Sequence, residues 1–213
     1  LETLQSLNSI ASLVLNISPD HMDRYQSLED YAAAKKRIFS GDGQMILNSD
    51  DPLVMAMVQA NRTTVCYGLS DSIENKFGVR DLENEMYLCH GNDKLISTSA
   101  LKIHGVHNVS NALGALALGD AIGLPMCSML EVLKEFSGLP HRCQWLANIK
   151  GVDWYNDSKG TNVGASCAAI EGLAKKQQQL ILIGGGDGKQ ADFAPLARTI
   201  QAHVQIVILI GKD

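Results

Sequence analysis

Short apolar runs alternate with helical stripes of apolar residues along most of the chain. Compact apolar runs predict buried strands, at 10–18, 44–48, 63–69, 144–149, 152–157, 180–183 and 205–210. Apolar spacings of three and four predict helices, at 28–39, from Pro52, at 107–125, 127–140, 162–173 and 192–202. Ser27, followed three residues later by Asp30, predicts a capped start for the helix at 28–39. Residues 85–98 resemble a hairpin around Gly91-Asn92. Alternating strands and helices predict an α/β fold with doubly wound, mostly parallel sheets.

The pattern restarts after Pro140, and we expect a domain boundary near 138–141, in "SGLPHR". The predicted domains are therefore 1–139 and 140–213. The chain starts at Leu1 and stops at Asp213, just after the strand-like run "VQIVILIG". A doubly wound sheet rarely ends on an uncovered strand, so we expect the chain to be a piece of a longer protein.

Composition narrows the class of protein without identifying it. The chain has 213 residues, is 46% hydrophobic and 19% charged, and carries a formal charge of -5. No basic run is present, which argues against nucleic acid as the main partner. No apolar stretch reaches the ~20 residues of a membrane span. The five cysteines are scattered and form no C-x-x-C pair, which favours reduced thiols in the cytoplasm.

The most distinctive stretch is "ILIGGGDGKQADF", where a strand leads into a glycine-rich turn with one lysine, Lys189. Such a turn suits an anion. A Walker A loop would need glycine at position 183 and a residue with a hydroxyl group at position 190, where this chain has Ile183 and Gln190. The turn is therefore not a Walker A loop. A dinucleotide fingerprint fits Gly186, Gly188 and Ala191, with Asp213 at the distance of a ribose contact. The fingerprint belongs to a first strand–helix turn, however, and a glycine turn that only allows close packing stays open.

Two further segments carry candidate chemistry. Asp20, His21 and Asp23 follow a predicted strand, where they can bind Mg²⁺, steer phosphates, or form a solvated loop. Lys35 lies at the centre of the apolar stripe of helix 28–39. A lysine there either extends its amine to solvent or serves a function that burial makes possible.

Polar residues also gather at three junctions. Asn108 and Asn111 share one face at the start of a predicted helix, where one of them can be the N-cap. "PHR" at 140–142 and "NDSKGTN" at 156–162 lie at a domain or strand junction, and the second precedes a helix whose free N–H groups favour an anion.

Several stretches taken together resemble the Mur ligase family. They are, in chain order, "LNISPDHMDRY", "YAAAKKRIF", "GVHNVSNALGALAL", "GLPHRCQW", "WYNDSKGTNVGA" and "GGGDGKQADFAPLA". The likeness covers most of the chain and is loose over 70–100. "NDSKGTN" with "GGDGK" favours the members that use D-glutamate.

The resemblance implies the later part of a P-loop-NTPase-like ATPase domain, followed by the start of a Rossmann-like C-terminal domain. Both would be incomplete here, because the family's UDP-binding domain and its G-T-N-G-K-[ST] phosphate loop have no counterpart in the 213 residues. The implied protein is a cytoplasmic, monomeric ligase of cell-wall synthesis that uses ATP and Mg²⁺. Its substrates would be UDP-N-acetylmuramoyl-L-alanine and D-glutamate, and the fragment alone would be inactive.

The resemblance also implies roles for individual residues. His21 and Glu2 would bind Mg²⁺, and Lys35 would be carbamylated and lie near the metal. Residues implied to contact ATP are Asn108, Asn111, Arg142 and Asp157. Thr161 and Lys189 would hold the carboxylates of D-glutamate. Two other hypotheses remain: a dinucleotide-dependent oxidoreductase domain, and a non-catalytic nucleotide-binding scaffold.

Overall fold

The computed structural model describes residues 3, 6–22, 24–70, 76–103, 105–174, 179–188 and 191–211. The chain divides into two compact units. Unit 1 comprises Leu1–Ile17 and Ser27–Phe136, and unit 2 comprises Ser18–Gln26 and Ser137–Asp213. The short segment Ser18–Gln26 therefore groups with the second unit, although the chain before and after it belongs to the first.

Unit 1 is built on a six-stranded sheet in the order β1-β2-β3-β4-β5-β6. The strands are β1 (Ala11–Val14), β2 (Gln44–Asn48), β3 (Thr64–Tyr67), β4 (Lys76–Leu82), β5 (Glu85–His90) and β6 (Asp93–Ser97). Strands β1 to β4 pair in parallel, whereas β4–β5 and β5–β6 pair antiparallel. The predicted hairpin at Gly91-Asn92 is confirmed, and β4 is a strand that the apolar pattern did not predict.

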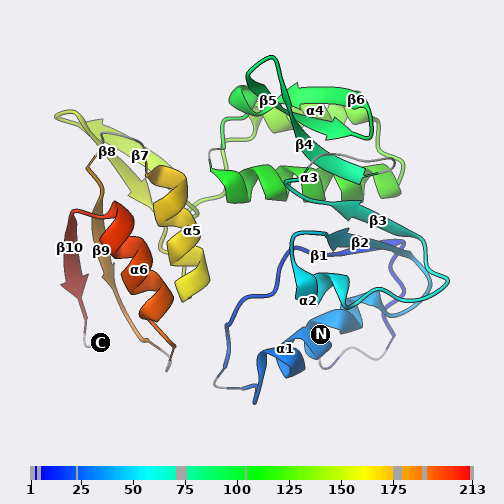
Figure 1. Ribbon diagram of the computed structural model, residues 1–213, viewed down its shortest axis with the longest axis horizontal. Coiled ribbons are helices and arrows are strands. Elements are labelled where there is room, and N and C mark those ends of the chain that lie inside the picture. The colour runs from blue at the N-terminus through cyan, green and yellow to red at the C-terminus, as the bar shows by residue number, and fades with distance from the viewer. Residues whose placement is uncertain are drawn as a thin grey trace. The chain divides into compact units, whose positions relative to one another are not determined.

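Helices cover both faces of the parallel part of this sheet (Figure 1). The helices described in unit 1 are α1 (Leu28–Lys36), η1 (Arg37–Phe39), α2 (Pro52–Met55), η2 (Thr98–Ala100), α3 (Val106–Ala121) and α4 (Met126–Glu135). Helix α3 crosses one face, and α1 and α2 lie on the other. This arrangement confirms the doubly wound α/β fold.

The local sequence explains where the first two helices begin. The Ser27 side chain accepts a hydrogen bond from the Asp30 amide at 3.1 Å, as the capping pattern predicted. Asp51 accepts from the amides of Leu53 and Val54 at the start of α2. Proline at the first position of α2 removes an amide that the helix leaves unpaired.

The main core lies between the sheet and α3. Its buried members are Ile46, Tyr67, Phe77, Val79, Leu88, Ile96, Leu101, Ala112, Leu113, Leu116, Ala117 and Leu133. Most of them come from the interior strands and from one face of α3, where apolar side chains recur at helical spacing. This burial fixes α3, which carries the candidate residues Asn108 and Asn111 near its start.

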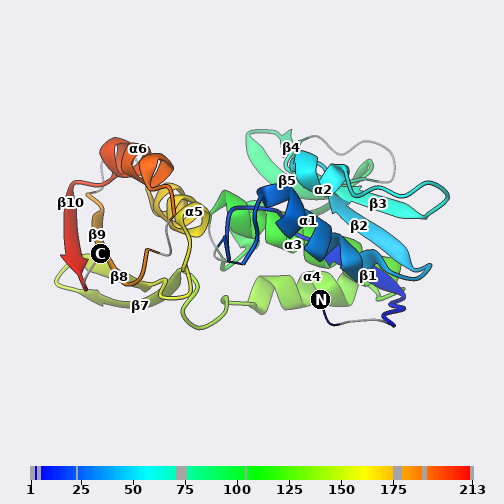
Figure 2. The same ribbon diagram turned by 90° about the horizontal axis from the view of Figure 1, so that it is seen from below.

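In the residues of unit 2 that the structure describes there are two separate two-stranded sheets and two helices that lie side by side (Figure 2). Its elements are β7 (Gln144–Ile149), β8 (Val152–Asn156), α5 (Val163–Leu173), β9 (Ile181–Gly185), α6 (Ala194–His203) and β10 (Ile206–Ile210). β7 and β8 form an antiparallel hairpin, and β9 pairs with β10 in parallel. All five residues of β10 are exposed, with Leu209 at 72%.

Candidate functional site

The backbone that leaves β1 is fixed in unit 1 at two points. The Leu15 carbonyl accepts hydrogen bonds from Asn48 Nδ2 at 2.9 Å and from the Tyr67 hydroxyl at 3.2 Å. The Ile17 amide donates to Asp51 Oδ2 at 2.6 Å. Asn48 is 7% exposed and Tyr67 is fully buried, so the anchors are rigid. They hold the chain in unit 1 up to Ile17, just before the segment with His21.

His21 lies in a tight turn beside the carboxylate of Asp20. Its φ of 56° is in the left-handed region, and its carbonyl accepts from the Arg24 amide at 2.8 Å. Asp20 Oδ1 accepts from the His21 amide at 2.9 Å, and Oδ2 lies 3.8 Å from His21 Nε2. The His21 side chain is 53% exposed and that of Asp20 is 20% exposed. An accessible imidazole beside a carboxylate fits a divalent cation.

The start of α5 carries the next candidate, Thr161. This residue is exposed, and its amide donates to the Lys159 carbonyl at 3.0 Å. Asn162 follows as the N-cap of α5 and accepts from the Ala165 amide at 2.8 Å. The amide groups that α5 leaves unpaired at its first turn make this a favourable place for a carboxylate.

Arg142 and Asp157 lie in two segments that are hydrogen-bonded to each other within unit 2. Asp157 Oδ1 accepts from the Cys143 amide at 2.9 Å, and the His141 carbonyl accepts from the Lys159 amide at 3.0 Å. Arg142 lies between the two bonded residues and is exposed. The structure therefore brings Arg142 and Asp157 into one local network.

Two residues of this network were not candidates from the sequence. A Cβ on Gly160 would lie 2.5 Å from Asp157 Oδ2, so a larger residue there would displace the Asp157 carboxylate. Burial, with a contribution from the Asp157 charge, raises the pKa of the Cys143 thiol to about 11. The thiol thus stays protonated at neutral pH and does not act as a nucleophile.

Lys35 lies in the last turn of α1, on the same side as the buried Tyr31. Its amine is 5.1 Å from the centre of the Tyr31 ring, and the residue is half-buried. The stem thus follows the buried face of the helix, as the apolar stripe predicted. The contact is compatible with an amine that reaches solvent and with one that is modified.

Asn108 and Asn111 lie one turn apart near the start of α3. The N-cap of α3 is Gly105, with φ of 97° and no side-chain cap, so the alternative that one asparagine caps the helix is wrong. Asn111 Nδ2 donates to Asn108 Oδ1 at 3.4 Å, and the pair is exposed. Two adjacent amides offer both donors and acceptors, which suits the polar edge of a heterocyclic base.

The packing and backbone conformation of the loop after β9 explain why Gly185 and Gly186 are glycines. A Cβ on Gly185 would lie 1.7 Å from the Ile210 carbonyl oxygen of β10. Gly186 has a φ of 131°, a backbone conformation that residues with a side chain rarely adopt. No atom lies within 4 Å of where its Cβ would be, so the backbone conformation and not a close contact favours glycine there. β9 is the third strand of unit 2 in chain order, after β7 and β8. Those two strands form a separate antiparallel hairpin, however, and β9 is the first of the two strands in the described parallel pair β9–β10. The order of the strands alone therefore does not decide between a dinucleotide fingerprint and another use of the loop.

Several candidates lie outside the described residues, namely Glu2, Asp23, Lys189 and Asp213. Across the described ranges, no three histidine, cysteine, aspartate or glutamate side chains gather closely enough to hold a metal ion. His21 belongs to unit 2, and Lys35 belongs to unit 1. The implied metal ligands thus remain predictions.

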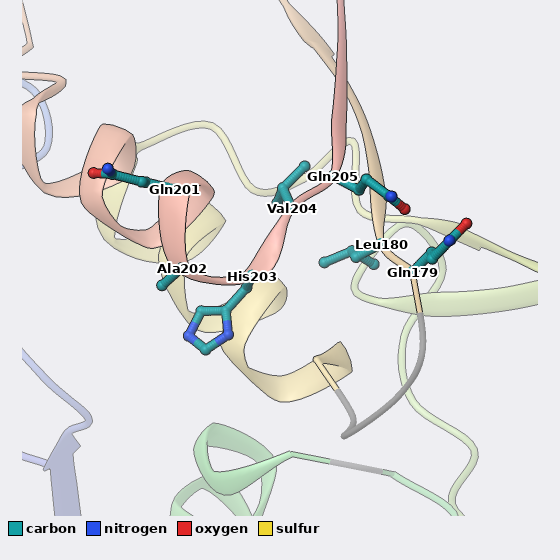
Figure 3. Close-up of a pocket in the computed structure, with 7 residues that line it drawn as sticks. All are labelled: Gln179, Leu180, Gln201, Ala202, His203, Val204 and Gln205. Carbon is teal, nitrogen blue, oxygen red and sulfur yellow. The ribbon is translucent and has the colours of Figure 1, made fainter.

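A cavity of about 390 Å³ lies at the other end of β9 and β10 (Figure 3). Gln179 and Gln205 extend from the two strand starts, and His203 from the end of α6. Ligands of α/β folds bind at the carboxyl ends of parallel strands. This cavity lies at the amino ends, so it is not the place where we expect substrate.

The sequence models of two domain families together match nearly the whole chain. Residues 2–119 match the Mur ligase middle domain, and residues 141–213 match the Mur ligase glutamate ligase domain. The chain belongs to the Mur ligase family. The resemblance seen in the six sequence stretches is thereby confirmed.

Curated relatives within the family point in the same direction. UDP-N-acetylmuramoylalanine--D-glutamate ligase from Nitrosococcus oceani is 50% identical over all of this chain, which covers 47% of that protein. The enzyme of the same name from Pseudomonas putida is 48% identical, again over all of this chain and 48% of that protein. The chain thus spans about half the length of these relatives.

Solved structures with little sequence identity share the fold. A pseudomurein peptide ligase from Methanothermus fervidus is 20% identical, with a TM-score of 0.70 over 95% of this chain and 53% of that one. MurF from Acinetobacter baumannii is 16% identical, with a TM-score of 0.72 over 95% of this chain and 47% of that one.

In the part of the Mur ligase chain that the structure describes, no helix is long and apolar enough to cross a bilayer.

Proposed function

We propose that this chain is part of an ATP-dependent ligase that joins D-glutamate to UDP-N-acetylmuramoyl-L-alanine, through an acyl phosphate, in peptidoglycan synthesis. The observation that carries the proposal is the 50% identity, over the entire chain, to a relative named for D-glutamate ligation. The exposed candidate residues, which lie at strand ends and helix starts, support it. ATP and Mg²⁺ would be its nucleotide and metal.

The reaction brings three negatively charged molecules, namely ATP and the two substrates, close together. A carboxylate oxygen of the first substrate attacks the γ-phosphorus of ATP, and ADP leaves. The amine of D-glutamate then attacks the acyl carbon, and phosphate leaves with the carboxylate oxygen that it received. Bound Mg²⁺ would supply screening of the phosphate charge. Positively charged side chains and free amides stabilise the charge that moves.

We assign the metal to His21, with Glu2 and a carbamylated Lys35 as further ligands. The pair of Asp20 and His21 fits a cation because its carboxylate and imidazole lie together and the imidazole is accessible. Carbamylation changes the Lys35 amine into an anionic group that can face a metal. The half-buried position beside Tyr31, on the buried side of α1, supports this role because it holds the end of the side chain in one place.

We assign nucleotide contacts to Asn108 and Asn111, which offer amides to adenine, and to Arg142 and Asp157, which contact ATP from unit 2. Thr161 and Lys189 would hold the carboxylates of D-glutamate. For Thr161 the support is its exposed position just before the free amides of α5. For Lys189 the support is its place in the loop after β9, at the carboxyl end of a parallel strand.

The test is ligation by the full-length protein, with ADP formation measured against each substrate. We expect ADP formation over many turnovers only when both UDP-N-acetylmuramoyl-L-alanine and D-glutamate are present, because the first step alone releases at most one ADP per enzyme. L-Glutamate is the matched control, since it has the same charge and differs only in configuration. ADP formation over many turnovers that does not depend on D-glutamate would contradict the proposal. Reduction of a nicotinamide cofactor by the protein would instead favour the oxidoreductase hypothesis.

A further inference from the structure

The segment Ser18–Gln26 is attached to the first turn of α5, although most of the chain lies between them in sequence. Asn162 Nδ2 donates to Asp20 Oδ2 at 3.3 Å, across 142 positions. A Cβ added at Gly164 would lie 3.5 Å from Ser18 Cβ, so the segment passes close to the first turn of the helix. Both belong to unit 2.

The oxygen and the nitrogen of the Asn162 side chain make hydrogen bonds to different segments. Its oxygen caps α5 by accepting from the Ala165 amide at 2.8 Å. Its nitrogen donates to Asp20, whose other oxygen accepts from the His21 amide at 2.9 Å. The Asp20 oxygen that meets Asn162 is also the one that lies 3.8 Å from His21 Nε2. Hydrogen bonds therefore link α5 through Asp20 to the His21 backbone, and the His21 ring lies beside the same Asp20 carboxylate.

We propose that Asp20 and Asn162 are positioning residues that hold the His21 imidazole and the Thr161 turn in one fixed arrangement. Asp20 orients His21 and strengthens its binding of a divalent cation, and Asn162 fixes Asp20 to the start of α5. Carboxylates beside a metal-binding histidine commonly act in this way, and their loss weakens metal binding by roughly 10- to 100-fold. The inference rests on the proposed function for the role of His21.

The chain allows the cap and the bridge to be separated. Asn162→Ser keeps an oxygen that caps α5, because serine and asparagine are similar N-caps, but it removes the donor to Asp20. Asn162→Ala removes both, so it is the matched control for lost stability. Asp20→Asn keeps an acceptor for the His21 amide and removes the charge.

The measurement is Mn²⁺ binding to the full-length protein, with free Mn²⁺ followed by electron paramagnetic resonance. We expect Asp20→Asn to weaken binding about tenfold or more and Asn162→Ser to weaken it several-fold. Asn162→Ser should keep the wild-type Tm, whereas Asn162→Ala should lower it by roughly 2–4 °C. In ligation assays, both bridge variants should need more Mg²⁺ for half-maximal rate and regain most of kcat at saturating Mg²⁺.

Wild-type Mn²⁺ affinity in both bridge variants would overturn the inference, since the contacts would then only stabilise the fold. Failure of the wild-type protein to bind Mn²⁺ would overturn it as well. The proposed function fails by a different result, which is ADP formation over many turnovers that does not depend on D-glutamate. Mn²⁺ binding is measured without turnover, so the two failures are distinguishable.

Discussion

Asp51 should be one of the most sensitive polar residues of unit 1. Its Oδ1 accepts from the amides of Leu53 and Val54, which caps α2, and its Oδ2 accepts from the Ile17 amide at 2.6 Å. A hydrogen bond to a charged group contributes about 1.5–3 kcal/mol, and an N-cap typically about 1 kcal/mol. Asp51→Asn keeps a capping oxygen but turns an NH₂ group toward the Ile17 amide.

We therefore expect Asp51→Asn to lower the free energy of unfolding by about 1.5–3 kcal/mol. Asp51→Ala also loses the cap, and should lower it by about 2.5–4 kcal/mol. At roughly 2–4 °C per kcal/mol, the asparagine variant should melt about 3–12 °C below the wild type.

Thermal unfolding followed by circular dichroism measures these shifts, and hydrogen exchange at the Ile17 amide tests the contact itself. Asp42→Asn, at an exposed position, is the control for loss of one negative charge. If Asp51→Asn melted with the wild type and the Ile17 amide kept its protection, the reasoning about this anchor would be refuted.

Four further predictions concern the candidate residues and one surface network. Lys35→Ala should abolish ligation, and added short carboxylates should partly restore it by taking the place of the carbamate; full activity without them would exclude carbamylation. Lys189→Ala should raise the KM for D-glutamate by roughly ten- to a hundredfold, the loss of a charge-assisted bond of about 1.5–3 kcal/mol. A rise in the KM for ATP instead would mean that the loop binds phosphate. Arg142→Ala should raise the KM for ATP and leave initial D-glutamate binding nearly unchanged, as measured by initial rates and equilibrium titration. Hydrogen bonds, chiefly from Ser97, lower the pKa of Glu85 to about 2, from its ordinary value of 4.5. Because the folded pKa is the lower one, this stabilisation is present above about pH 4.5 and is lost as the pH falls toward about 2. The difference in Tm between wild type and Glu85→Gln should shrink over that interval, and a constant difference would contradict the assignment.

Local sequence rules predicted the parts of the fold that depend on neighbours in the chain. The Ser27 cap and the hairpin at Gly91-Asn92 follow from a few adjacent residues, and the structure has both. β4 was not predicted, because Gly78 interrupts its apolar pattern and polar residues fill its second half. The helix start at Gly105 also escaped prediction, since glycine there acts through its backbone and not through a capping side chain.

Contacts between distant segments could not be predicted from the sequence. Asp20 was a candidate from its own neighbourhood, but its bond to Asn162 spans 142 positions and follows no local periodicity. The glycines after β9 pointed to an anion, whereas Gly185 is needed because the β10 backbone passes so close to it. The sequence contains the residues of such contacts, and only the fold brings them together.

The most direct test of the central proposal follows an oxygen atom. UDP-N-acetylmuramoyl-L-alanine with ¹⁸O in its terminal carboxylate is incubated with the full-length protein, ATP and D-glutamate, and the released phosphate is analysed by mass spectrometry. An acyl phosphate requires that each phosphate carry one oxygen from the carboxylate, so the account predicts one ¹⁸O per phosphate at full labelling. Phosphate without ¹⁸O, formed while the amide product accumulates, would contradict it.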